Sequence, residues 1–231
     1  MPTLTAPTDR DERGLLTTMH PPAVRTEPAA IDVLHAYVLE SVGHDPVVWP
    51  GGWPEEIEAA LIDAVFSVRA RYGNRERKTG VFGAVTRWRE QRGARVDDLR
   101  VLAATAPDTL RTITNNGKIA GRYKAEVVID AAGALVKASI VTADDFRHHQ
   151  NLAKPAYLNV RGCGPVTWAY LRMLSEVDDV KADTWLMRFV HDRIPDASQD
   201  EATTLLKGVA QRMNVEARRL DHAVWAYRRR A

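Results

Sequence analysis

The chain has 231 residues, a formal net charge of +2, one cysteine, and hydrophobic side chains at 45% of its positions. A chain of this length can bury a core as one domain or as two lobes. A single cysteine excludes an internal disulfide framework. The sequence contains no apolar run of membrane-spanning length and no signal-peptide pattern after Met1. We therefore expect a soluble intracellular protein that binds no membrane.

The first third of the chain is predicted to be helical after an irregular start. Residues 1–28 are rich in proline, threonine and charge without apolar periodicity, which predicts a disordered leader. A first helix is expected over Ile31–Val42, followed by a loop over His44–Pro54. Glu55-Glu56 places acidic residues at the start of a second helix, whose apolar residues repeat at helical intervals as far as Gly73-Asn74, where it ends.

The rest of the chain follows the same pattern. Ser198-Gln-Asp-Glu201 is a capping-box sequence that opens a helix, and Asn214 is expected to cap the last helix. Alternation with a period of two is nearly absent, and we find no internal repeat, so the predicted fold class is all-α. Further helices are predicted over residues 79–91, 97–105, 107–114, 122–137 and 142–151.

The most informative segment is Leu158-Asn-Val-Arg-Gly-Cys-Gly-Pro-Val-Thr-Trp-Ala169, which predicts a helix, a Gly-x-Gly turn and a second helix. Gly162 and Gly164 permit backbone conformations and close approaches that a side chain would block, and Pro165 suits the first position of the second helix. The free N–H groups at the start of that helix can hold a nucleic-acid phosphate. The alternative is an ordinary tight turn between packed helices.

Two sets of hairpin residues are assigned on this basis. Phosphate binding is assigned to Gly162, Gly164, Val166 and Thr167. Carbonyl groups left free on the turn could hold a Na⁺ or K⁺ ion that bridges to the same phosphate, and they are assigned to Leu158, Val160 and Cys163.

A lone acidic residue stands at the start of the next predicted helix, in Lys181-Ala-Asp-Thr-Trp-Leu-Met-Arg188. Asp183 can serve as a helix N-cap, a role that aspartate performs well. A fixed carboxylate can also stabilise the positive charge that develops on a sugar when its glycosidic bond breaks. The two roles can coexist in one side chain, and the pairing with the hairpin favours chemistry on DNA.

The hairpin segment resembles that of the helix-hairpin-helix base-excision DNA glycosylases, the superfamily that includes endonuclease III. Val180–Val190 is similar to the family's segment that carries the catalytic aspartate, and this resemblance places that role on Asp183 and the family's arginine on Arg188. Lys124–Ile129 resembles the helix that precedes the hairpin, and Ala60–Ser67 resembles the first long helix of the central lobe. The resemblance spans roughly residues 55 to 190 and implies that the substrate is double-stranded DNA with a damaged or modified base.

Three positions depart from the family pattern. Val166 stands where members with lyase activity carry a lysine, and valine cannot form a Schiff base. Cys163 is the only cysteine, so a four-cysteine iron–sulfur cluster is excluded. Trp185 replaces the family's histidine after Asp-Thr. These departures predict a monofunctional glycosylase that requires no cofactor.

The resemblance also implies an architecture. The glycosylase domain would cover residues 29–231, with a central lobe at about 55–180. A second lobe would combine residues 31–50 with residues 181–231, and Asp183 would stand at the cleft between the lobes. We expect a monomer located in the cytoplasm, associated with the nucleoid if the source is bacterial.

DNA-binding and base-binding residues are the next candidates. Because the target sugar cannot be reached inside a duplex, the nucleotide must leave the stack. Trp49, Trp53, Trp88 and Trp225 are expected in the core, Arg228-Arg229-Arg230 is expected to be a solubilising tail, and no histidine is assigned a catalytic role. DNA contacts are assigned to Arg69, Arg71, Lys118, Arg122, Lys124 and Arg188, and the base pocket or the wedge that replaces the base to Tyr72, Asn74, Trp168 and Trp185.

Three functions remain open from the sequence. The first is a monofunctional DNA glycosylase of base excision repair, in which Asp183 stabilises the sugar cation or orients water. The second is a non-catalytic helix-hairpin-helix protein that senses distorted DNA and has no need of Asp183. The third is a bifunctional enzyme whose amine comes from another residue, such as Lys154 or Lys181. We favour the first.

Overall fold

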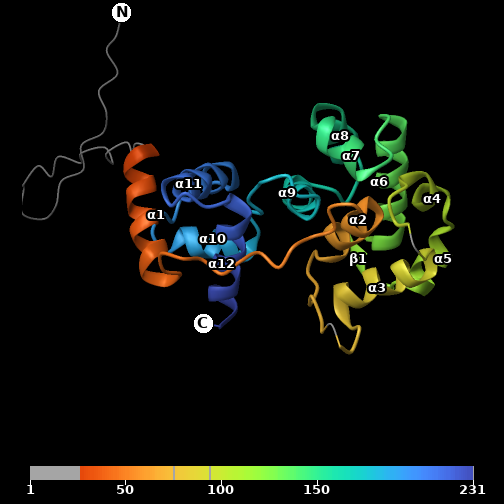
Figure 1. Ribbon diagram of the computed structural model, residues 1–231, viewed down its shortest axis with the longest axis horizontal. Coiled ribbons are helices and arrows are strands. Elements are labelled where there is room, and N and C mark those ends of the chain that lie inside the picture. The colour runs from red at the N-terminus through yellow and green to blue at the C-terminus, as the bar shows by residue number, and fades with distance from the viewer. Residues whose placement is uncertain (1–26, 75, 94, 231) are drawn as a thin grey trace, which may run out of the picture.

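The computed structural model describes residues 27–74, 76–93 and 95–230. The protein is 62% helix and 2% strand, which confirms the prediction of an all-α chain. Residues 1–26 of the predicted leader lie outside the described residues, but the prediction was wrong for the last two, because helix α1 already begins at Glu27. Within the described ranges, Figure 1 shows two groups of helices joined by extended segments, with α9 between them.

The first group is built around two buried helices. Every residue of α2 (Ile57–Phe66) is buried, and α6 (Lys124–Lys137) packs against it and against α4 (Leu99–Ala104). The small residues Ala125, Ala131 and Ala132 face the core on α6. The helices that complete this group are α3 (Gly80–Arg92), α5 (Pro107–Ile113), α7 (Ala143–His148), α8 (Gln150–Leu158) and α9 (Pro165–Leu174).

The second group joins the two ends of the described chain. Helix α1 (Glu27–Ser41) packs on α11 (Gln199–Arg212), and α12 (Ala217–Arg230) packs on α10 (Thr184–His191) and α11. Its buried residues, which include Leu34, Phe189 and Leu206, form a hydrophobic cluster separate from that of the first group. The chain crosses between the groups twice, before α2 and after α9.

Several predicted boundaries need correction. The region predicted as one helix over 122–137 begins with strand β2 (Arg122–Tyr123), and the helix starts only at Lys124. Strand β2 pairs antiparallel with β1 (Lys118–Ile119), and Gly121 permits the tight turn between them. The helix predicted over 142–151 is two helices, α7 and α8, which meet at His149. The second helix ends at Phe66 instead of continuing to Tyr72.

The capping predictions had mixed outcomes. The Ser198 side chain accepts a hydrogen bond from the Glu201 N–H, as the capping box predicts. Asn214 does not cap α12 and instead occupies a left-handed turn conformation, with φ of 54°. Asp178, which is distant in sequence, accepts hydrogen bonds from the first two N–H groups of α12, at Ala217 and Arg218. A cap supplied by tertiary packing leaves no local sequence signal.

Candidate active site

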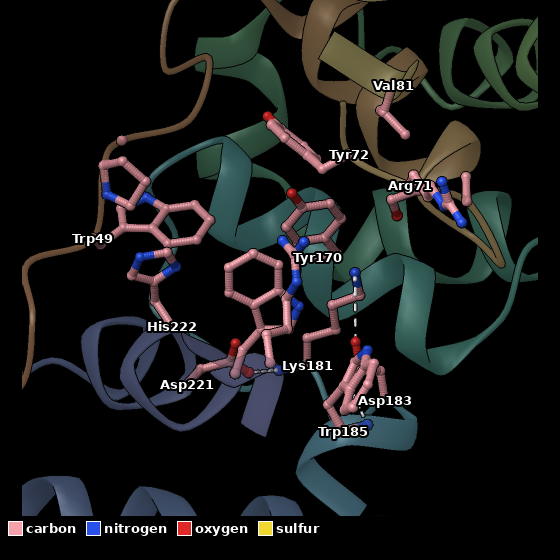
Figure 2. Close-up of a pocket in the computed structure, with 16 residues that line it drawn as sticks. Trp49, Arg71, Tyr72, Val81, Tyr170, Lys181, Asp183, Trp185, Asp221 and His222 are labelled. Carbon is pink, nitrogen blue, oxygen red and sulfur yellow. Dashed lines mark hydrogen bonds and ion pairs between the residues drawn. The ribbon is translucent and has the colours of Figure 1, made fainter. Parts of the chain in front are cut away.

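A cavity of about 500 Å³ lies between the two groups of helices and is lined by residues of both (Figure 2). The first group and the segment before it supply Trp49, Pro50, Gly51, Ser67, Ala70, Arg71, Tyr72, Val81 and Tyr170. The second group and the segment before α10 supply Lys181, Asp183, Trp185, Asp221, His222, Trp225 and Arg229. Asp183, the residue singled out in the sequence, therefore lines a partly open cavity that is large enough for a planar ring system.

Asp183 divides its two carboxylate oxygens between two tasks. It is the N-cap of α10, where Oδ1 accepts hydrogen bonds from the N–H groups of Trp185 at 2.8 Å and Leu186 at 3.3 Å. The expected cap is therefore confirmed. Oδ2 lies 3.9 Å from the Lys181 Nζ, and Figure 2 shows these two side chains pointing toward each other in the pocket. The cap fixes the carboxylate and leaves one oxygen available to a ligand.

Lys181 extends along the wall of the cavity. Its Nζ lies 3.7 Å from the centre of the Tyr170 ring, a distance suited to a cation–π interaction. Its backbone N–H donates a hydrogen bond of 2.7 Å to Asp221 Oδ2. Burial lowers the pKa of Lys181, while the carboxyl groups of Asp183, Asp221 and Asp63 oppose that shift. The amine is thus held beside Asp183 in an environment that disfavours its charge.

Asp221 is the second carboxyl group of the cavity. It lies on α12, in the group of helices that also carries Asp183, and is only 5% exposed. Burial raises the pKa of Asp221 well above its ordinary value, and the nearby charges of Asp183 and Asp179 raise it further. Because the pH at which a carboxyl group loses its proton follows this pKa, Asp221 keeps its proton to a higher pH than an exposed aspartate.

Aromatic rings form much of the remaining wall. Trp49 meets His222 edge to face with ring centroids 5.4 Å apart, and His222 stacks on Trp225 at 5.6 Å. The Arg229 guanidinium lies 4.7 Å from the centre of the Trp225 ring. Burial lowers the pKa of His222, which favours a neutral imidazole. Trp185 is 37% exposed at the cavity. Flat rings of this kind suit the stacking of a planar ligand.

Three sequence expectations about these residues were wrong. Trp49 and Trp225 were expected in the core, yet they line the cavity. Arg228-Arg229-Arg230 was expected to be a solubilising tail, but Arg229 lines the cavity and Arg228 pairs with Asp192. Because Trp225 and Arg229 reach the cavity only through the packing of α12 on α10, no local pattern indicates their position.

Tyr72 is held in the cavity wall by a buried carboxyl group. Its hydroxyl donates a hydrogen bond of 2.9 Å to Asp63 Oδ2, which also accepts one from Trp53 Nε1 at 2.9 Å. Asp63 is fully buried on α2, and burial raises its pKa. Tyr72 was expected either in the base pocket or as the wedge, and its place in the cavity wall fits the first of these roles. Asn74 does not line the cavity, and its side-chain oxygen instead accepts the N–H of Arg77 within an exposed turn.

The Gly-x-Gly segment forms the predicted turn between α8 and α9. Gly162 has φ of 108°, and a Cβ there would lie 3.0 Å from Val127 on α6, so glycine is required. Gly164 is the N-cap of α9 in an extended conformation, with open space where a Cβ would stand. The turn leads into the N-terminus of α9. Tyr170 faces the cavity about 9 Å further along the helix axis.

The N–H groups of this turn differ from the expectation in one respect. The N–H of Gly164 is not free, because it donates to the Thr167 Oγ1 at 2.9 Å. Since Pro165 has no N–H, the groups left at the start of α9 are those of Val166 and Thr167, for which no described residue provides an acceptor. The anion site assigned from the sequence is thus reduced to two donors.

One of the three carbonyl groups assigned to a cation already accepts a hydrogen bond within the turn. The Val160 carbonyl accepts the N–H of Cys163 at 2.9 Å, while Leu158 is the last residue of α8. Burial raises the pKa of the Cys163 thiol to about 11. Within the described parts of the chain, no group of three or more histidine, cysteine or acidic residues is arranged to hold a metal ion.

Two further assignments were wrong. Trp168 is buried and packs against Phe146 and Tyr157 in the core of the first group, so it neither stacks on a base nor acts as a wedge. The Lys124 Nζ donates to the carbonyl oxygens of Phe66 and Val68 at 2.8 and 2.6 Å. It thereby binds the last carbonyl of α2, and burial lowers its pKa to about 8. Lys124 is a structural residue and not a DNA contact.

The other basic residues remain at the surface. Arg69, Lys118 and Arg188 are exposed, and Arg71 is exposed at the rim of the cavity. Arg122 is paired with Asp130 at 2.6 Å, which reduces its value as a phosphate contact. Arg161, which sequence reasoning did not assign, is exposed in the hairpin turn next to Gly162. No described helix is long and apolar enough to cross a membrane.

Residues 32–229 match the family described as Domain of unknown function (DUF8548), and the chain belongs to that family. Comparison with curated proteins gave no match, and comparison with solved structures gave none either. The functional argument therefore depends on the geometry of the cavity and on the sequence motifs.

Proposed function

We propose that this protein is a DNA glycosylase with the two-lobed helix-hairpin-helix glycosylase fold, and that it hydrolyses the N-glycosidic bond of a flipped-out damaged or modified base. The observation that carries the proposal is the position of Asp183. One of its oxygens is fixed by the α10 N-terminus, and the other faces a cavity of about 500 Å³. A residue that served only as a helix cap would not need to line a cavity.

Asp183 supplies the electrostatic part of the mechanism. As the bond between base and sugar breaks, C1′ acquires positive charge, and a carboxylate held in place stabilises that charge without reorganisation. Asp183 Oδ2 would face C1′ and orient the attacking water. Burial lowers the pKa of Lys181, which weakens the competition of its amine with the sugar for the charge of Asp183.

The cavity wall supplies the binding site for the base. An extruded base stacks on aromatic rings, and Trp49, Trp185 and Trp225 present such rings to the cavity. Across the cavity, Tyr72 and Tyr170 form the wall contributed by the first group of helices. The arrangement suits a planar heterocycle, and a base bound there would lie next to Asp183.

The hairpin would hold the DNA backbone. The N–H groups of Val166 and Thr167 at the start of α9 can bind a phosphate, and the positive end of the helix dipole favours the anion. Exposed Arg161 stands in the same turn, and Arg71 stands at the rim of the cavity. Because α9 carries both the turn and Tyr170, a phosphate held at the turn would set the distance from the DNA backbone to the cavity.

A second candidate is the same chemistry followed by strand cleavage. Val166 excludes the family's lysine position, but the Lys181 Nζ lies 3.9 Å from Asp183 Oδ2 inside the cavity. An amine there is the one that a lyase step would use. We favour the monofunctional enzyme, because the contact with the Tyr170 ring and the ion pair with Asp183 already occupy that amine.

The proposal is tested with duplexes that each carry one altered base, such as uracil, hypoxanthine, 7-methylguanine or 8-oxoguanine, treated with alkali after incubation. Wild type should release at least one of these bases. Asp183→Asn should fold, because asparagine caps a helix about as well as aspartate, and should release that base on the order of 10²–10³ times more slowly. Asp178→Asn, which changes the cap of α12 outside the cavity, is the matched control and should keep the wild-type rate.

Two other outcomes would reject the proposal. If Asp183→Asn releases the base as fast as wild type, Asp183 is only a helix cap. If wild type releases no base from any duplex but binds distorted DNA more tightly than intact DNA, the protein is a non-catalytic sensor.

A further inference from the structure

The cavity holds a second carboxyl group that the proposed role of Asp183 does not use. Asp221 Oδ2 accepts the N–H of Lys181 at 2.7 Å, and no described residue donates a hydrogen bond to Oδ1. The side chain is almost fully buried but still contributes to the cavity wall. Figure 2 shows Asp221 beside His222, with Lys181 between the two carboxyl groups of the site.

The charges around Asp221 come from three neighbouring elements. The segment before α10 brings Lys181, Asp183 and Asp179 to it, α9 brings the Tyr170 hydroxyl, and His222 is its neighbour on α12. Asp179 is already paired with Arg172 at 2.6 Å and with Lys207 at 2.5 Å, so these cations do not neutralise Asp221.

The two carboxyl groups therefore have different environments in one cavity. Asp183 is held by two N–H donors of a helix terminus and lies partly open to the cavity. Burial and the neighbouring carboxylates raise the pKa of Asp221, which favours its protonated form. Pairs of carboxyl groups whose surroundings separate them in this way commonly divide the work between a charged stabiliser and a proton donor.

We propose that Asp221 is the general acid of the reaction and donates its proton to a ring nitrogen of the departing base. The inference rests on the proposed glycosylase function. In the step, the C1′–N bond breaks, its electron pair stays on the base, and the Asp221 proton forms the new N–H bond. Water then adds to C1′ and returns a proton to the Asp221 carboxylate, so the acid is regenerated. The neutral base that results is a far better leaving group than its anion.

The leaving group distinguishes this role from a structural one. A neutral base such as hypoxanthine needs protonation before it departs, whereas 7-methylguanine already carries a positive charge and leaves as a neutral molecule. A general acid contributes on the order of 10²–10⁴ in rate only where a proton must be transferred. A residue that merely holds Lys181 in place should affect both bases equally.

The variant for this test is Asp221→Asn. Asparagine has nearly the same size, and its side-chain oxygen can still accept the Lys181 N–H. It should release a neutral base at least about 100-fold more slowly than wild type while losing less than about tenfold on 7-methylguanine. Asp178→Asn removes a carboxylate at the start of the same helix and should affect neither rate. If the asparagine variant does not fold, Asp221→Ser replaces it.

The pH dependence of single-turnover base release is the second measurement. The acid acts only while protonated, so the wild-type rate on a neutral base should fall about tenfold per pH unit once the pH exceeds the pKa of Asp221. In Asp221→Asn this decline should be absent. If the variant keeps the decline, or loses the same factor on both kinds of base, Asp221 is not the acid.

The outcomes separate the two proposals. If Asp183→Asn slows the release of a neutral base while Asp221→Asn releases that base at the wild-type rate, only the role of Asp221 fails. If wild type releases no base from any duplex, the glycosylase function fails and this inference fails with it.

Discussion

Buried acidic residues occur in both groups of helices, but their surroundings differ. Glu58 on α2 is fully buried, and it accepts hydrogen bonds from Trp88 Nε1, from two nitrogens of Arg92 and from the backbone N–H of Asp98. Asp221 on α12 accepts one hydrogen bond and faces a cavity. A buried charge with a full set of partners stabilises the fold, whereas one with an open side is available for chemistry.

The contrast extends to lysine. The Lys124 Nζ donates to two carbonyl oxygens at the end of α2 and has a structural role. The Lys181 Nζ rests on an aromatic ring and lies 3.9 Å from the carboxylate of Asp183 in the cavity wall. Both amines have a lowered pKa caused by burial, so the shift alone does not mark a functional residue. A functional residue is marked instead by an adjacent cavity and by polar atoms that lack a full set of hydrogen-bond partners.

The largest expected effect is a loss of stability when Glu58, the buried carboxylate with a full set of partners, is removed. Glu58→Ala leaves Arg92 and the Trp88 indole without their partner, and breaking a buried ion pair typically costs about 3–5 kcal/mol of unfolding free energy. Urea denaturation should show this loss. Glu56→Ala, which breaks the more exposed pair with Arg89 on the same side of α2, should cost at most about 1 kcal/mol. Equal losses in the two variants would contradict the distinction.

A smaller effect is expected at the hairpin. Gly164 has an extended backbone, and a Cβ there would have no neighbour within 4 Å, so Gly164→Asp should fold normally. Its carboxylate would repel the phosphate expected at the start of α9, so duplex affinity should fall about tenfold or more and the salt dependence should weaken by about one unit. Gly164→Ala adds no charge and is the control. Unchanged affinity of the folded Asp variant, measured by fluorescence anisotropy, would remove the hairpin from the DNA-binding surface.

The smallest expected signal concerns strand cleavage. With Val166 at the family's lysine position, breaks in the DNA should appear only after alkali or heat. Borohydride should trap no covalent complex between wild type and abasic DNA. If a complex forms and Lys181→Met abolishes it while Lys154→Met does not, Lys181 supplies the amine and the monofunctional proposal is wrong.

Local sequence signals predicted those parts of the protein that depend on neighbouring residues. The turn at Gly162, the N-cap at Asp183 and the capping box at Ser198 are each encoded within a few residues. Trp168 was misassigned because its position in the sequence beside the hairpin suggested the site, whereas its position on α9 directs the indole toward Phe146 and Tyr157.

The part of the cavity wall that α12 supplies could not be predicted in this way. Asp221, His222 and Trp225 reach the cavity only because α12 packs on α10. The hydrogen bond from Lys181 to Asp221 joins residues 40 positions apart in the sequence. The same packing supplies Asp178 as the cap of α12 in place of the predicted Asn214. Contacts between distant segments leave no periodic pattern, so the sequence singled out Asp183 but not the residues of α12 that line the same cavity.

The central claim is that the charge of Asp183 faces the sugar of a flipped nucleotide. It is tested most directly by binding, without knowledge of the excised base. Two duplexes are compared, one with a cationic pyrrolidine ring in place of the sugar and one with a neutral tetrahydrofuran ring. Wild type should bind the cationic duplex about tenfold or more tightly than the neutral one, and Asp183→Asn should bind both alike. Equal binding of the two duplexes by wild type, or an undiminished preference in Asp183→Asn, would contradict the claim.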